Sequence, residues 1–130
     1  EHLEPYRTEW MVWDKELKLA GSIDMTYIRK DGTIDIYDWK RCKEIKKDNR
    51  WESAKTGCIN HLPNSNFWHY SLQLNTYKAI LERNYDVNVG DMYLVCLHPN
   101  NKNNSYQLLK VPDLQKEIKE LFNLRLRLIN

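Results

Sequence analysis

The chain has few of the residues that mark disulfide-rich, fibrous or disordered proteins. Only three of its 130 residues are cysteine, and glycine and proline contribute four each. An odd number of scattered cysteines argues against a disulfide framework and fits a reducing compartment. No stretch approaches about eighteen uninterrupted apolar residues, and Glu1–Pro5 contains no signal-peptide core. We therefore expect an intracellular protein that is neither secreted nor bound to a membrane.

The residues that are plentiful favour one globular domain over residues 1–130. Hydrophobic side chains make up 42% of the sequence and charged ones 29%, with five Trp and eight Tyr. This composition is typical of a chain that buries a core. The net charge of +2 decides little, but residues 40–55 hold seven Lys or Arg against three acidic residues. Such a segment is either a solvated face or a surface for phosphates.

Hydrophobic periodicity predicts an order of strands, helix, strands and helix. Alternation indicates strands, and apolar residues at helical spacing indicate a long helix and a terminal helix. We expect strands at 7–14, 17–28, 33–40, 92–98 and 106–111, helices at 67–84 and from 112 onward, a short helix at 49–56 and a loop at 61–66. The predicted fold class is α/β (α+β), with a central mixed sheet flanked by helices.

The turn between the second and third strands decides which residues face each other. A three-residue turn over 30–32, with its glycine in the left-handed conformation, sets Asp24 directly opposite Asp38. A two-residue turn over 31–32 would instead set Asp24 opposite Trp39, on the other face of the sheet. Only the three-residue turn gives a register that places the two aspartates on the same face of the sheet, where they could form a site.

Charged residues continue an apolar row on the third strand. Residues two apart in a strand share a face, so Asp38 and Lys40 follow Ile34 and Ile36 on one side. Carboxylates of Asp24 and Asp38 across neighbouring strands repel unless a cation lies between them. A divalent metal meets that need, and oxygen-only ligands favour Mg²⁺ or Mn²⁺.

Three segments, in order, carry a resemblance to a known family. They are Gly21-Ser22-Ile23-Asp24, Asp38-Trp39-Lys40 and Gln73-Leu74-Asn75-Thr76-Tyr77. Together they resemble the PD-(D/E)XK nuclease superfamily, and most closely its RecB-like exonuclease branch. The resemblance covers roughly residues 7–97 and implies a restriction-endonuclease-like core.

The resemblance implies roles for the two acidic segments. In the family, the aspartates of the G-x-x-D and D-x-K segments bind the metal, helped by the backbone carbonyl of the middle residue of D-x-K. Here these ligands are Asp24, Asp38 and the carbonyl of Trp39. The family's lysine, here Lys40, orients the attacking water and stabilises negative charge.

Further contacts are expected outside the acidic segments. By resemblance, Gln73 and Tyr77 contact substrate, and Tyr77 also belongs to an apolar stripe that fits a core role. Arg41 and Lys43 are expected to bind the polynucleotide backbone. Glu9 is a candidate additional metal contact, with a surface role as the alternative. Four aromatic residues fit either base stacking or the core: Trp51, Phe67, Trp68 and Tyr70.

The expected function is a Mg²⁺- or Mn²⁺-dependent nuclease that hydrolyses phosphodiester bonds, as an exonuclease, in replication, recombination or repair. Nucleic acid is the expected partner, with DNA favoured over RNA. The alternative is a catalytically inactive nucleic-acid-binding or interaction domain on the same fold. The chain could also be a fragment of a larger replication or repair protein.

Overall fold

A computed structural model describes residues 4–41, 66–97 and 106–129. Their elements, in chain order, are β1 (Glu4–Asp14), β2 (Leu19–Ile28), β3 (Ile34–Arg41), α1 (Asn66–Asn84), β4 (Val89–Leu97), β5 (Tyr106–Lys110) and α2 (Gln115–Ile129). No described helix is long and apolar enough to cross a membrane. The predicted helix at 49–56 and residues 61–65 of the predicted loop lie outside the described residues. Asn66, predicted as the end of that loop, is instead the first residue of α1.

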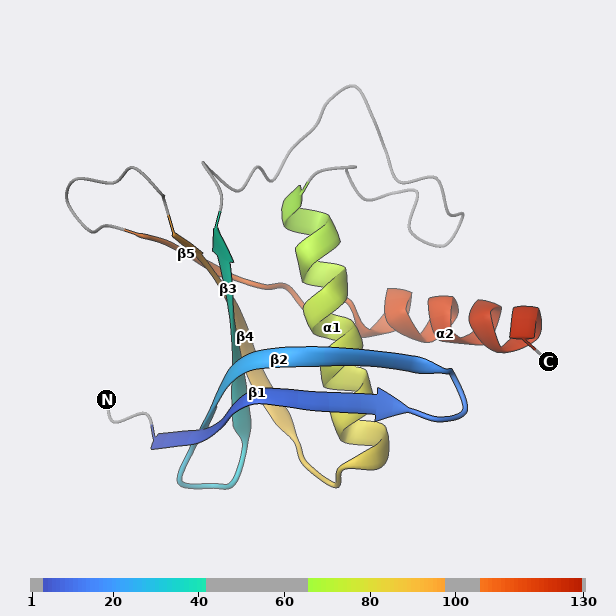
Figure 1. The fold of residues 1–130 in the computed structure, drawn as a ribbon, viewed down its shortest axis with the longest axis horizontal. Coiled ribbons are helices and arrows are strands. Elements are labelled where there is room, and N and C mark those ends of the chain that lie inside the picture. Colours follow the sequence, from blue (N-terminus) through green and yellow to red (C-terminus); the bar gives the residue numbers. More distant parts are fainter. Residues whose placement is uncertain (1–3, 42–65, 98–105, 130) are drawn as a thin grey trace.

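The five strands form one mixed sheet in the order β1-β2-β3-β4-β5. The β3–β4 pair is parallel, and the other neighbouring pairs are antiparallel. Parallel neighbours need a crossover connection, and α1 lies in the connection between β3 and β4. In Figure 1, α1 stands beside the sheet while α2 extends away from it. This mixed sheet with two helices confirms the predicted restriction-endonuclease-like α/β fold.

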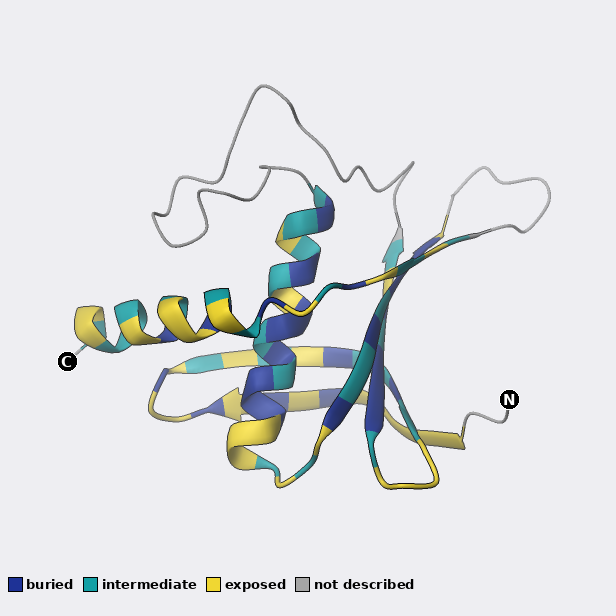
Figure 2. Ribbon diagram, turned by 180° about the vertical axis from the view of Figure 1, so that it is seen from behind, coloured by how far each residue is buried: buried dark blue, intermediate teal, exposed yellow. Residues whose placement is uncertain are grey.

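The main core lies between α1 and the sheet. Ile36 and Leu94 from the central strands are fully buried, as is Leu74 on α1. Figure 2 shows the buried positions on the side of α1 that faces the strands. A second cluster joins α1, α2 and the β1–β2 turn, and it consists of Leu17, Ala79, Ile118 and Phe122. The core therefore holds α1 against the strands on one side and against α2 on the other.

The first four strands begin one to three residues away from their predicted starts: the first begins at Glu4 and the third at Ile34. The second strand begins at Leu19, because Leu17 lies in the turn, where its buried side chain packs in the cluster with α2. The fourth begins at Val89 rather than at Met92, since Val89 pairs with Ile34 of β3. For the second and fourth strands, the chain's packing partner, which is remote in sequence, decides the boundary.

The hairpin between β2 and β3 has the predicted register. The Arg29 N–H donates to the Thr33 carbonyl at 2.8 Å, and Gly32 adopts a φ of 89°. Tyr27 pairs with Asp35, and the pairing continues to Met25 opposite Tyr37. This is the three-residue turn, because Arg29 and Thr33 face each other on either side of residues 30–32. The pairing ends at Met25 and Tyr37, one position before Asp24 and Asp38.

β2 bends just before it reaches β3. Ile23 and Thr26 are both fully buried although they are three residues apart, so the inside–outside alternation changes between them. On β1, Glu9 has a φ of 48° and lies between the paired residues Thr8 and Trp10. Such irregularities bend a strand and redirect its side chains. Figure 1 shows the curve of β2. Asp24 lies between Ile23 and Thr26, where the alternation changes.

Asp14 anchors the β1–β2 turn to the end of α1. Its side chain is 2% exposed and accepts hydrogen bonds at 2.9 Å from the Leu17 N–H, Arg83 Nε and Asn84 Nδ2. Burial alone would raise the pKa of Asp14, but these donors outweigh it and lower the pKa. Ionised Asp14 therefore stabilises the fold above the ordinary aspartate pKa, and this contribution is lost as the pH falls through the lowered value.

We expect Asp14→Asn to lower the free energy of unfolding by about 2 kcal/mol at neutral pH, because the variant leaves buried donors without a charged acceptor. The difference from wild type should shrink at acid pH, where wild-type Asp14 is protonated. Urea denaturation between about pH 7 and pH 3 measures both effects. Glu120→Gln, at an exposed position of α2, is the control. A difference that did not change with pH would contradict the assigned ionisation.

Candidate active site

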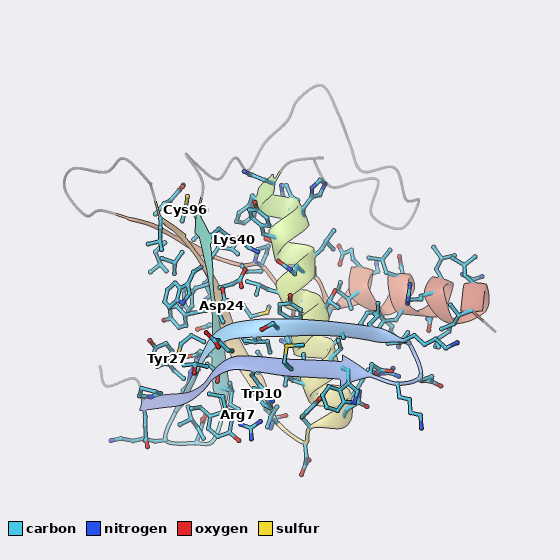
Figure 3. The ribbon with its side chains drawn as sticks, in the orientation of Figure 1. Arg7, Trp10, Asp24, Tyr27, Lys40 and Cys96 are labelled. Atoms are coloured by element: carbon cyan, nitrogen blue, oxygen red, sulfur yellow. The ribbon has the colours of Figure 1, made fainter. Side chains whose placement is uncertain are left out.

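Residues from three elements meet where β2 and β3 face α1. β2 contributes Asp24, β3 contributes Asp38 and Lys40, and α1 contributes Gln73 and Tyr77. Figure 3 shows the labelled Asp24 and Lys40 beside α1. The structure therefore brings together the residues of all three motifs from the sequence.

Asp24 reaches β3 where the regular strand pairing stops. The last β2–β3 pair is Met25 with Tyr37, and the next N–H on this edge, that of Trp39, donates to Asp24 Oδ2 at 2.9 Å. A side-chain oxygen thus replaces the backbone acceptor of a sheet ladder. This contact fixes the Asp24 carboxylate beside the D-x-K segment and leaves Trp39 43% exposed on the opposite face.

Asp38 is a buried acid beside another acid. It is 4% exposed, and its Oδ2 atom lies 2.8 Å from Lys40 Nζ but accepts no hydrogen bond of normal geometry. Burial is the largest influence and raises the pKa of Asp38 to about 6. Lys40 opposes this shift, and the nearby Asp24 carboxylate adds to it. Part of the Asp38 population is therefore protonated near neutral pH without a further cation.

The donor set fits a hard divalent cation. Two carboxylates and a nearby backbone carbonyl are all-oxygen ligands, and Asp38 Oδ2 is a buried oxygen that lacks a well-directed donor. Within 4–41, 66–97 and 106–129, no cluster of three or more His, Cys, Asp or Glu side chains could hold an ion. Mg²⁺ commonly uses one or two carboxylates and completes its shell with water and phosphate, so a smaller protein set suffices.

Glu9 is not brought into this group. In the β1–β2 register its position lies across from Asp24, between the pairs Thr8–Met25 and Trp10–Ile23. Its side chain is exposed and its backbone has a positive φ, which redirects the side chain from the regular strand direction. The structure describes no contact between Glu9 and the two aspartates.

Lys40 is held from the helix as well as from its own strand. Its Nζ atom donates to Gln73 Oε1 at 2.9 Å, so Gln73 contacts the lysine directly. The same nitrogen lies 4.5 Å from the centre of the Tyr70 ring. Sequence reasoning did not find the Tyr70 contact, although Tyr70 and Gln73 are three residues apart on one helix and therefore share a face.

Gly21 and Tyr77 connect the first motif to the third. Tyr77 is 7% exposed and belongs to the main core, as the alternative to substrate contact expected, and its substrate contact stays a prediction. A Cβ atom at Gly21 would overlap the Tyr77 ring. Burial is the main cause of a raised Tyr77 pKa, and the charge of Asp38 adds to it. The ring thus packs on a glycine backbone while it lies in the field of the acidic pair.

Asn75, in the middle of the third motif, fixes α1 to the start of α2. It is fully buried and donates to the carbonyls of Ser71 at 2.8 Å and Pro112 at 3.0 Å. It also accepts from the Leu114 N–H at 2.9 Å and from Gln115 Nε2 at 2.9 Å. These bonds set the position of the helix that presents the glutamine and the tyrosine.

The structure describes only some of the other residues that were predicted to contact nucleic acid. Phe67 is buried in the main core, with Trp68 packed edge-on against it, so Phe67 serves packing. Lys43 and Trp51 lie outside the described residues, as does the side chain of Arg41. Their predicted nucleic-acid contacts therefore stay predictions.

Comparisons with known proteins agree with this geometry. The model of the PD-(D/E)XK nuclease superfamily matches residues 1–129. Among solved structures, a chain described as a putative exonuclease from Eubacterium rectale superposes with a TM-score of 0.52 at 12% sequence identity. The match covers 95% of this chain and 42% of that one, and its low identity shows the fold alone. No curated protein matches. The family match over nearly the whole sequence places this chain in the PD-(D/E)XK nuclease superfamily.

Proposed function

We propose that the chain is a divalent-metal-dependent nuclease that hydrolyses phosphodiester bonds in DNA. The observation that carries this proposal is the buried Asp38 carboxylate, which lies beside Asp24 and against the Lys40 ammonium. A protein that used these residues only for structure would bury charge at a cost that ordinary packing avoids. Members of this superfamily generally use divalent metals, and the all-oxygen donor set favours Mg²⁺ or Mn²⁺ here.

The chain's own residues have distinct roles in the proposed reaction. Asp24, Asp38 and the Trp39 carbonyl would hold the metal, which when bound neutralises charge on the scissile phosphate and lowers the pKa of a bound water. The Lys40 ammonium donates hydrogen bonds to the attacking water or to the negatively charged phosphate. Gln73 orients that ammonium through its 2.9 Å hydrogen bond.

Substrate, mode and biological role are further parts of the proposal. The motif order resembles the RecB-like branch, which supports DNA as substrate and attack from a strand end. Arg41 is the last residue of β3 and Lys43 comes two residues later in the sequence, where cations would bind the polynucleotide backbone. We place the activity in replication, recombination or repair, within a larger protein. The tyrosine at the helix, Tyr77, would contact substrate only through the edge that the core leaves accessible.

A cleavage assay tests the proposed function. Purified chain should degrade end-labelled linear DNA with Mg²⁺ or Mn²⁺, lose activity when EDTA removes the metal, and spare closed circular DNA. Lys40→Met should reduce cleavage at least about a hundredfold. Lys110→Met, which removes an exposed lysine of β5, is the matched control. Binding of DNA without metal-dependent cleavage would instead support the inactive binding domain.

A further inference from the structure

The Lys40 ammonium has described partners on two sides. On β3, Asp38 Oδ2 lies 2.8 Å away. On α1, Gln73 Oε1 accepts a hydrogen bond at 2.9 Å, and the Tyr70 ring centre lies 4.5 Å from the nitrogen. The Lys40 side chain is 20% exposed, so these contacts act in a partly desolvated place. The two helix partners lie one turn apart on α1 and face the strand together.

The aromatic ring differs chemically from the other two partners. A ring face attracts an ammonium through its quadrupole, and it carries no charge or lone pair that competes for the protons of the amine. Asp38 is also a proposed metal ligand, and a carboxylate that coordinates a metal forms a weaker ion pair with Lys40. A metal at the carboxylates would also repel the ammonium. Partners on α1 keep the ammonium in place under those conditions.

We propose that Tyr70 is a positioning residue for Lys40, holding the ammonium against α1 by a cation–π contact so that it remains aimed at the reacting phosphate. This inference rests on the proposed nuclease function for its catalytic consequence, but the contact itself does not depend on cleavage. In this proposal the face of the Tyr70 ring contacts the Lys40 ammonium instead of stacking on a nucleic-acid base. Tyr70 packs against the main core as well, so the test must separate ring electrostatics from packing.

Nuclear magnetic resonance tests the contact without any activity. Protons above an aromatic ring are shifted upfield, so the Lys40 ε-methylene signal of labelled protein should lie upfield of an exposed lysine such as Lys110. Tyr70→Phe should retain this shift and Tyr70→Leu should remove it, with Mg²⁺ absent and present. A Lys40 signal at the ordinary lysine position in wild type would overturn the proposed contact even if the protein cleaves DNA.

Graded fluorination of the ring tests the catalytic consequence. Phenylalanine, difluorophenylalanine and trifluorophenylalanine at position 70 have similar size but progressively weaker cation–π attraction. We expect kcat on labelled DNA to fall stepwise along this series, by about tenfold in total, with KM and the melting temperature nearly unchanged. Equal kcat values across the series would overturn the positioning role. If the wild-type protein did not cleave DNA at all, the proposed nuclease function would be contradicted. The Tyr70–Lys40 contact would still be tested by the NMR shift.

Discussion

Asp38→Asn is expected to abolish cleavage and to stabilise the metal-free protein above about pH 6. Asparagine keeps the shape of the side chain but removes the charge that holds a cation, so cleavage should fall by about a thousandfold or more. The stability change has the opposite sign because burial raises the pKa of Asp38 from 3.8 to about 6. An acid with a raised pKa opposes folding once it must ionise.

The sign of the pH dependence follows from that shift. Below the unfolded-state pKa of 3.8, Asp38 is protonated in both states, so its ionisation does not lower the stability of the fold. Above about pH 6 the folded protein must hold Asp38 ionised, and the full loss of stability is present. The raised pKa makes ionised Asp38 unfavourable in the fold, and loss of the Lys40 ion pair in the variant offsets part of the gain from removing that charge. We expect a net gain of about 1 to 2 kcal/mol for Asp38→Asn near pH 8 and almost none near pH 4.

Asp35→Asn is the matched control for this experiment. Asp35 is a buried aspartate on the same strand, 4% exposed, but it faces the other side of the sheet and pairs with Arg29 at 2.7 Å. Its replacement should lower stability and leave cleavage within a few-fold of wild type. Urea denaturation without metal, beside a cleavage assay with Mg²⁺, distinguishes the two variants. Wild-type cleavage by Asp38→Asn would exclude the assigned role.

Gly21→Ala is expected to damage both stability and cleavage through Tyr77. The added Cβ atom overlaps the Tyr77 ring, so the ring or α1 must move. Overpacking of this kind costs about 1 to 3 kcal/mol, and a displaced α1 also moves Gln73 away from Lys40. We expect cleavage to fall by about ten- to a hundredfold, since positioning errors near 1 Å are costly for catalysis.

A double substitution separates this clash from other effects of Gly21. Tyr77→Leu removes the ring that the new methyl group meets, so Gly21→Ala should cost less in that background than in wild type. Ser22→Ala, at the exposed neighbouring position of β2, serves as the control. Thermal denaturation of the four proteins in the cycle measures the coupling. Additive losses would show that Gly21 and Tyr77 do not interact.

The hairpin and its acidic pair could be predicted because their determinants are local. Gly32 in a short turn fixes the register, and the pairing runs up to Met25 and Tyr37, the residues next to Asp24 and Asp38. Charged residues at the end of an apolar strand, such as Asp38 and Lys40, can also be recognised in the sequence. The family resemblance added the helix motif, whose residues the structure places at the same site.

Features that depend on packing between remote elements could not be predicted in this way. The bend of β2 violates alternation between Ile23 and Thr26, and no residue between them signals it. The Tyr70–Lys40 contact needs the distance between α1 and β3, which the packing of the core sets. For the same reason the turn residue Leu17 is apolar without belonging to a strand, since its partners lie on the two helices.

A manganese soak of crystals of this chain tests the central claim most directly. Mn²⁺ scatters anomalously, so its position can be determined independently of any assay. The proposed site predicts one strong anomalous peak between Asp24 and Asp38, about 2.1 Å from a carboxylate oxygen of each and close to the Trp39 carbonyl. Crystals of Asp38→Asn should lose that peak. Saturating Mn²⁺ that left the space between the two aspartates empty, or bound only elsewhere, would contradict the assignment of these residues as a metal-dependent nuclease centre.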